Sequence, residues 1–198
     1  MLYKFLSGLA KGVTHCIFRV KVVGKENVPK DGGMILAVNH KSNWDPIFAG
    51  AYCPRPLRFM AKADLFKNKL FGGLIKKLGA FPIQRGRGDI GAIKGAFSIL
   101  KNNDAMLIFP EGHRIKNGKR VKAKLGVSMI AVYAKVPVIP LCISGEYKPF
   151  HKVTVTFGKP ITFEEYYGKK PDNETLQTLA DEVMQTIYSF DNTDIKKI

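Results

Sequence analysis

Short apolar runs with the length of buried strands alternate along this 198-residue chain with stretches of helical periodicity. The first run, Met34 to Val38, is continuous and typical of a strand that is buried on both faces. Further strands are expected at 57–61, 80–84, 105–109, 137–143 and 152–157, with helices starting at Pro46 and spanning about 66–78, 89–102, 124–134 and 172–189. This alternation predicts an α/β fold, a single domain with a mainly parallel mixed sheet flanked by helices.

The first eighteen residues carry apolar side chains at helical spacing. The stripe comprises Leu2, Phe5, Leu6, Leu9, Val13 and Ile17. We therefore expect residues 1–20 to form an N-terminal amphipathic helix that lies on a membrane surface, followed by the main domain at 21–198. The alternative is that the stripe packs on the domain itself. Neither a signal peptide nor a membrane span is expected, because charged residues and prolines interrupt the apolar runs.

Positive charge is in excess, since 32 Lys and Arg against 16 Asp and Glu give a net charge of +16. Residues 1–160 hold 28 of these bases but only eight of the acids. A body this basic suggests a polyanionic partner, namely nucleic acid, an anionic membrane surface or an acidic protein, although a solvated basic face would look the same. The sequence has no RNA-binding aromatic motif, zinc-finger spacing or clear helix-turn-helix, so no nucleic acid partner is expected.

His40 and Asp45 follow the first apolar run, at the end of a strand where ligands usually bind in open α/β sheets. If the carboxylate folds back onto one imidazole nitrogen, it fixes the tautomer and leaves the other nitrogen free as a general base. Asp45 alone has a simpler explanation, because an Asp before a proline is a good helix cap. His40 has no such structural explanation, which makes the pair a candidate catalytic site.

The segment 109–114, Phe-Pro-Glu-Gly-His-Arg, also follows an apolar strand. Arg114 could grip a phosphate as a fork, Glu111 could accept a hydrogen bond from a hydroxyl, and Gly112 would allow close approach. The alternative is a polar loop with a surface Glu–Arg pair. A basic stretch follows and adds positive potential; it contains Lys116, Lys119, Arg120, Lys122 and Lys124.

A third strand end, 81–85, supplies a further candidate phosphate ligand in Arg85. The next residues, 86–91, spell Gly-x-Gly-x-x-Gly and superficially meet the dinucleotide-binding fingerprint. We reject that interpretation because Pro82 suits an edge strand, whereas the fingerprint requires a central one. No nicotinamide or flavin cofactor is therefore expected.

The sequence shows no residues for two common mechanisms, covalent catalysis by a nucleophilic serine and catalysis by a bound metal ion. No Gly-x-Ser-x-Gly motif is present, and the four histidines and three cysteines show no metal-ligand spacing. The three cysteines also form no even disulfide set, which fits a reducing cytoplasm. The residues favour a base that activates an acceptor hydroxyl directly, without a metal or another cofactor.

Taken together, four blocks resemble the glycerolipid acyltransferase family, specifically its short bacterial 1-acyl-sn-glycerol-3-phosphate acyltransferases. Asn39-His40 through Asp45-Pro46 matches the family block Asn-His-x-x-x-x-Asp-Pro. Residues 81–85, 109–114 and 138–141 resemble the second, third and fourth blocks, in family order. One departure is His113, which stands where the third block of the family usually has Thr.

The resemblance implies roles for individual residues. His40 would be the catalytic base and Asp45 its orienting partner. The residues implied in substrate binding are Arg85, Glu111, Gly112, His113 and Arg114 for the glycerol phosphate, and Pro140 for the acyl-side wall.

The resemblance also implies a reaction, in which a fatty acyl group moves from a thioester of acyl carrier protein or CoA to the sn-2 hydroxyl of 1-acylglycerol-3-phosphate (lysophosphatidate), giving phosphatidic acid. Glycerol-3-phosphate or another lysophospholipid is the alternative acceptor, because these enzymes share the motifs. A basic nucleic-acid-binding module is the alternative of another class. Residues 21–198 would be the acyltransferase domain of a peripheral or monotopic protein at the cytoplasmic face of the cell membrane.

Overall fold

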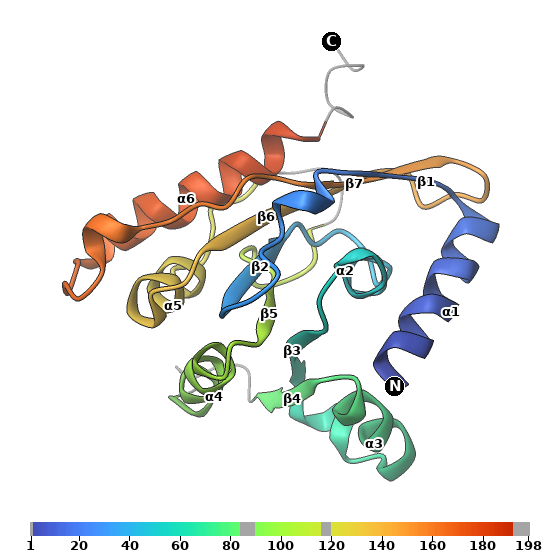
Figure 1. The fold of residues 1–198 in the computed structure, drawn as a ribbon, viewed down its shortest axis with the longest axis horizontal. Coiled ribbons are helices and arrows are strands. Elements are labelled where there is room, and N and C mark those ends of the chain that lie inside the picture. The colour runs from blue at the N-terminus through green and yellow to red at the C-terminus, as the bar shows by residue number, and fades with distance from the viewer. Residues whose placement is uncertain (1, 84–89, 116–119, 192–198) are drawn as a thin grey trace.

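A computed structural model describes residues 2–83, 90–115 and 120–191, which form one α/β domain around a seven-stranded sheet (Figure 1). The strands are β1 (Arg19–Val23), β2 (Met34–Val38), β3 (Leu57–Lys62), β4 (Ala80–Ile83), β5 (Ala105–Ile108), β6 (Val138–Gly145) and β7 (Lys152–Phe157). Their order across the sheet is β1-β7-β6-β2-β5-β3-β4. Because only the β6–β7 pair is antiparallel among these neighbours, β1 and β7 run against the other five strands. The predicted mainly parallel mixed sheet is confirmed.

Helices cover both faces of this sheet (Figure 1). They are α1 (Leu2–Ile17), α2 (Asp45–Tyr52), α3 (Lys69–Lys77), α4 (Ile90–Lys101), α5 (Gly126–Ala134) and α6 (Asn173–Ser189), with short 3-10 turns at Lys25–Asn27, Ala63–Phe66 and Glu164–Tyr166. One core lies between the sheet and α4, α5 and α6, and the other lies between the sheet and α2. Among the helices of the described ranges, none is long and apolar enough to cross a membrane.

Strand β2 shows why the chain folds into these layers. All five of its residues are buried, and their side chains alternate between the two cores. Met34, Leu36 and Val38 face the α2 side, whereas Ile35 and Ala37 face α5 and α6. An apolar residue is therefore needed at every position, which explains the continuous run. Since β2 lies mid-sheet between β5 and β6, the residues after Val38 emerge at the centre of the sheet's carboxyl edge.

Most predicted elements match the structure to within a few residues, and two differences have clear physical causes. Strand β1 was not predicted from the sequence, because its alternating exposed and half-buried residues form an edge strand that pairs with residues more than 130 positions away. The predicted helix 66–78 is shorter, because a 3-10 turn ends at Phe66 and the Asn68 side chain caps α3 by accepting from the Phe71 N–H. Strand β4, which contains Pro82, lies at the opposite edge, as the proline predicted.

Helix α1 packs on α2 and is joined to it by hydrogen bonds from side-chain hydroxyls. Tyr3 and Ser7 donate hydroxyl hydrogen bonds to carbonyl oxygens of Gly50 and Ala51, and the Thr14 hydroxyl shares one with Tyr52. The exposed apolar residues of this helix are Leu2, Phe5, Leu9 and Val13. The predicted stripe is thus divided, because Leu6 and Ile17 are half-buried against the domain while the other four face outward.

Candidate active site

The site begins where β2 ends, at Asn39. This buried side chain acts like one more residue of the sheet, since its amide donates to the carbonyl of Ile143 at 3.1 Å and accepts from the Ile143 N–H at 2.8 Å. The side chain thereby ties the end of β2 to β6 just where the backbone turns away. His40 is therefore held on a rigid platform rather than on a free loop.

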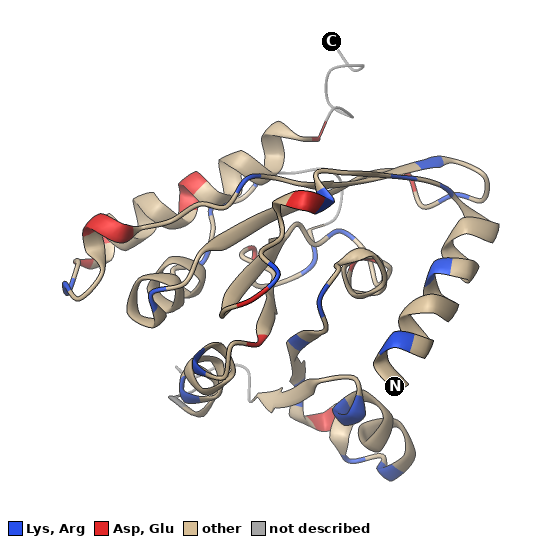
Figure 2. Ribbon diagram, in the orientation of Figure 1, with Lys and Arg blue, Asp and Glu red and all other residues tan. Residues whose placement is uncertain are grey.

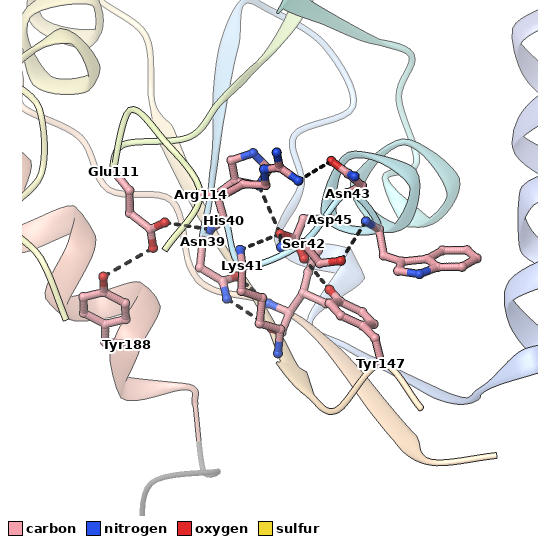
Figure 3. Close-up of polar contacts among 12 residues, drawn as sticks. Asn39, His40, Lys41, Ser42, Asn43, Asp45, Glu111, Arg114, Tyr147 and Tyr188 are labelled. Carbon is pink, nitrogen blue, oxygen red and sulfur yellow. Dashed lines mark hydrogen bonds and ion pairs between the residues drawn. The ribbon is translucent and has the colours of Figure 1, made fainter. Parts of the chain in front are cut away.

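His40 and Asp45 form a hydrogen-bonded pair, with 3.1 Å between the imidazole Nδ1 and the carboxylate Oδ2 (Figure 3). Helix α2 starts at Asp45, so the turn between β2 and α2 brings the two side chains together. The imidazole also stacks on Phe109, with ring centroids 4.0 Å apart and an angle of 20° between the planes. Because Nδ1 is bound to the carboxylate, Nε2 is the nitrogen that can take a proton from a substrate.

Asp45 is buried and accepts hydrogen bonds from three donors in addition to its contact with His40. The backbone N–H groups of Lys41 and Ser42 donate to Oδ2, each at 2.6 Å, and the Tyr147 hydroxyl donates to Oδ1. Burial and the adjacent Asp45 carboxylate raise the pKa of Tyr147, which keeps the phenol protonated as a donor. The carboxylate is consequently fixed in one orientation, and so is the imidazole that it contacts.

Glu111 lies behind the histidine and is only 3% exposed. One carboxylate oxygen accepts from the His40 N–H at 3.0 Å, and the other accepts from the Tyr188 hydroxyl of α6 at 3.3 Å (Figure 3). Burial raises the pKa of Glu111 to about 7, although both donors oppose this shift. The backbone carbonyl of His40 also accepts from the Ile115 N–H at 2.8 Å, so Glu111 and Ile115 hold the His40 backbone through its N–H and its carbonyl.

This arrangement changes what Glu111 can do. The sequence predicted that its carboxylate accepts a hydrogen bond from the substrate, but both of its oxygens contact protein donors and the side chain is buried. In the structure it positions His40. A contact between Glu111 and substrate stays a prediction that would require the side chain to leave at least one of these partners.

Gly112, His113 and Arg114 are the exposed residues of the 109–114 segment, whereas Pro110 is buried and Phe109 packs on His40. Gly112 has a φ of 77°, a left-handed conformation that an L-residue with a side chain rarely adopts, and this turn directs the next residues away from the core. The Arg114 guanidinium donates to the side-chain oxygen of Asn43 at 2.8 Å, which brings a cation to the loop between His40 and Asp45. A phosphate could be bound there.

Two other predicted site residues lie elsewhere. Arg85 falls outside the described residues. Pro140 is buried in β6 and pairs with Ala37 of β2, so it helps build the sheet that carries His40. Its place in an acyl-binding wall stays a prediction, since Pro140 does not line the apolar pocket described next.

An apolar pocket of about 220 Å³ lies between α1, α2 and strands β3 and β5. It is lined by Tyr3, Leu6, Ser7, Ala10, Pro46, Ile47, Gly50, Ala51, Leu57, Phe59, Leu78 and Leu107. The first turn of α2 links the pocket to the polar site, because Asp45 contacts His40 while Pro46 and Ile47 form the pocket wall. The pocket thus offers space for an apolar group against the helix that starts at Asp45.

Sequence reasoning missed two residues of this site, Tyr147 and Tyr188. Tyr147 follows β6 as His40 follows β2, so the rule that polar residues after buried strands form sites could have found it. No comparable signal marked Tyr188, which falls within the apolar pattern of α6 and resembles a core residue. Within the described ranges, no group of three or more His, Cys, Asp or Glu residues is arranged to hold a metal ion.

Comparisons with known proteins agree with this geometry. A profile of the acyltransferase family matches residues 19–144, which include His40, Asp45 and the 109–114 segment. The 1-acyl-sn-glycerol-3-phosphate acyltransferase of Bacillus subtilis is 31% identical over 96% of this chain and 98% of its own. That of Streptococcus pneumoniae is 33% identical over 96% of this chain and 74% of its own. The crystal structure of a 1-acyl-sn-glycerophosphate acyltransferase from Thermotoga maritima superposes with a TM-score of 0.76 at 27% identity, covering 99% of this chain and 80% of the other.

Proposed function

Because the chain belongs to the acyltransferase family and is a 1-acylglycerol-3-phosphate acyltransferase, we propose that it moves a fatty acyl group from a thioester to the sn-2 hydroxyl of lysophosphatidate. The product is phosphatidic acid. The observation that carries this proposal is the His40–Asp45 pair, which lies at a strand end with the backbone of its histidine held by Glu111 and Ile115. Such a pair activates a hydroxyl without a covalent enzyme intermediate.

The proposed reaction uses His40 first as a base and then as an acid. Nε2 takes the proton from the sn-2 hydroxyl while the hydroxyl oxygen attacks the thioester carbonyl. The tetrahedral intermediate collapses, the carbon–sulfur bond breaks, and the leaving thiolate takes the proton from the imidazolium. The Asp45 carboxylate supports the positive imidazole through Nδ1, as the third member of a serine-protease triad does.

Recognition of the acceptor is assigned to Arg114 and the loop beside it. The guanidinium is exposed and is held by Asn43, two residues before Asp45, where it can bind the phosphate of lysophosphatidate as a fork. His113, which is also exposed, would supply a further donor to that phosphate. The phosphate would thereby hold the sn-2 hydroxyl near Nε2 of His40.

Recognition of the fatty chain is assigned to the apolar pocket. Its lining is almost entirely apolar, and it starts at the residues directly after Asp45. An acyl chain placed there would have its reacting end next to His40. Each buried methylene contributes about 0.8 kcal/mol, so even part of one chain provides substantial binding energy.

We further propose that the protein works at the cytoplasmic face of the cell membrane as a peripheral or monotopic protein. Its substrate is a lipid, and α1 exposes Phe5 and Leu9, at 69% and 56%, on a strongly basic body. Apolar insertion and attraction to anionic lipid then act together. The acyl donor is a thioester of acyl carrier protein or CoA, both of which are anionic and suit the basic surface.

A turnover assay with purified protein tests the proposed function. Lysophosphatidate and glycerol-3-phosphate are each offered with acyl-carrier-protein and CoA thioesters, and the lipid products are quantified. The proposal predicts phosphatidic acid from lysophosphatidate with at least one donor and a much slower reaction with glycerol-3-phosphate. Acylation of glycerol-3-phosphate alone would assign the enzyme to the preceding acylation step, and no product with either acceptor would refute the proposal.

A further inference from the structure

Helix α3 has an apolar face that the described residues leave largely exposed. Its Leu70 is 89% exposed, and Phe71 and Leu74 are 48% and 43% exposed. Only Gly72 and Ile75 of this helix are buried. Gly72 fixes the docking, because a Cβ at this position would lie 2.8 Å from the backbone of Phe66. The helix is therefore held close to the domain by one side, and its large apolar residues face outward.

The surroundings of this face are positively charged (Figure 2). Five lysines lie on α3 and on the segment before it, at Lys62, Lys67, Lys69, Lys76 and Lys77. The acidic residue in this stretch is Asp64, which forms salt bridges with Lys62 and Lys67 at 2.5 and 2.8 Å. The stretch therefore carries a positive excess around three exposed apolar side chains, the pattern of a helix that binds an anionic lipid surface.

The apolar pocket connects this helix with α1. Leu78, which directly follows α3, lines the same pocket as Tyr3 and Leu6 of α1. Figure 1 shows α3 near the N-terminal end of α1. The two helices thus border one apolar pocket, and each exposes large apolar residues to the outside.

We propose that α3 is a second membrane-contacting helix, which inserts Leu70, Phe71 and Leu74 among lipids while its lysines contact anionic headgroups. This inference rests on the proposed function, since a membrane-presented acceptor gives the contact its purpose. A bilayer fits better than an acidic carrier protein, because the apolar exposure extends over two separate helices that flank one apolar pocket. With α1 alone the protein has a single apolar anchor, and two anchors on either side of the pocket would fix its orientation on the membrane.

A fluorescent label tests the contact at one residue. Cys16 is the exposed cysteine, whereas Cys53 and Cys142 are buried, so a Cys16→Ser background permits selective labelling. Leu70→Cys carries a polarity-sensitive dye, and Tyr133→Cys on α5 serves as the control for an exposed site on the opposite face of the sheet. With phosphatidylglycerol vesicles the dye at position 70 should shift to the blue, and that at 133 should not. Vesicle binding without a shift at position 70 would overturn the proposal.

Substitutions on α3 measure how much its apolar face contributes to membrane binding. A triple variant, Leu70→Gln, Phe71→Gln and Leu74→Gln, should bind anionic vesicles on the order of tenfold more weakly than a Tyr133→Gln control, because three insertions are lost. Equal binding by the two proteins would refute the proposal, and so would weakened binding of acyl carrier protein with unchanged vesicle binding. Circular dichroism checks the fold of both variants.

A separate assay distinguishes failure of this inference from failure of the proposed function. Turnover of lysophosphatidate in detergent micelles requires no bilayer. If the wild-type protein is active in micelles but α3 does not contact vesicles, only the inference about α3 is wrong. If α3 inserts into vesicles but lysophosphatidate is not acylated in micelles, the proposed function is wrong and the membrane contact stands.

Discussion

The surroundings of His40 and the apolar edge, meaning the exposed apolar side chains of α1 and α3, differ in which kind of group is buried. Around His40, polar groups are buried, and each buried side-chain nitrogen and oxygen of the described residues has a hydrogen-bond partner. Along α1 and α3, large apolar groups are exposed in two stripes. Burial of a polar group is unfavourable in free energy unless the group is hydrogen-bonded, so the groups around His40 must keep their partners and are held in fixed positions. An exposed apolar stripe is unfavourable in water, so the second region makes sense only with another surface against it.

The difference separates two tasks of a lipid-modifying enzyme. The rigid polar region fixes the orientation of a base, because strands β2, β5 and β6 hold its parts from three neighbouring positions in the sheet. At a bilayer, the proposed partner of the exposed apolar residues of α1 and α3, no such precision would be needed, since a bilayer offers no single geometry to match. Substitutions in the first region should therefore change rate constants, and those in the second should change membrane affinity.

The largest expected effect is that of His40→Ala. Loss of a general base typically slows the reaction by 10²- to 10⁴-fold, and we expect a fall in kcat of that order. The apolar edge is untouched, so binding to anionic vesicles should not change. His151→Ala, at an exposed histidine beside β7, is the control and should retain wild-type turnover. Loss of vesicle binding in His40→Ala would break the separation of the two tasks.

Tyr147→Phe should have a smaller effect of the same kind. It removes one hydrogen bond to the buried Asp45 carboxylate, so the carboxylate orients the imidazole less firmly and kcat should fall roughly tenfold. The KM values for both substrates should stay near those of the wild type, because Tyr147 acts through Asp45. A raised KM with an unchanged kcat would contradict this positioning role. Tyr133→Phe is the matched control.

Arg114→Ala should act on the acceptor rather than on the donor. The loss of a charge-assisted contact to phosphate should raise the apparent KM for lysophosphatidate about tenfold, with little change in the KM for the thioester. Arg58→Ala, which removes an exposed arginine paired with Asp104, is the control. If only the KM for the thioester rose, our assignment of the two substrate sites would be reversed.

The smallest effect concerns stability, at Glu111. Its pKa is raised from an ordinary 4.5 to about 7, so the folded state binds more protons than the unfolded state between these values. The contribution of Glu111 to the free energy of unfolding is therefore greatest below pH 4.5 and is lost as the pH rises through about 7. Glu111→Gln resembles the protonated acid and removes this titration. The melting temperature of the wild-type protein should fall more between pH 5 and 8 than that of the variant, with Glu165→Gln as an exposed control.

The sequence predicted the parts of the fold that depend on local pattern. The continuous run 34–38 is typical of a buried strand, which the structure confirms, and His40 stood out because no structural role explained a histidine just after such a strand. Contacts between segments that are distant in the sequence were harder to predict. β1 carries alternating charged residues and is stabilised by pairing with β7, and Tyr188 reaches Glu111 from α6, 77 residues away. The hydrogen bonds that Glu111 accepts from Tyr188 and from the His40 N–H therefore could not be predicted from a local pattern, and its contact with substrate stays a prediction.

The separation of the two tasks is tested most directly by measuring phosphatidic acid formation in detergent micelles and on anionic vesicles with three proteins. These are the wild type, His40→Ala, and the α1 variant Phe5→Gln with Leu9→Gln. We expect His40→Ala to lose turnover in both settings, and the α1 variant to lose it on vesicles while it keeps it in micelles. Wild-type turnover by a folded His40→Ala protein in micelles would contradict the account, because the base would then lie elsewhere.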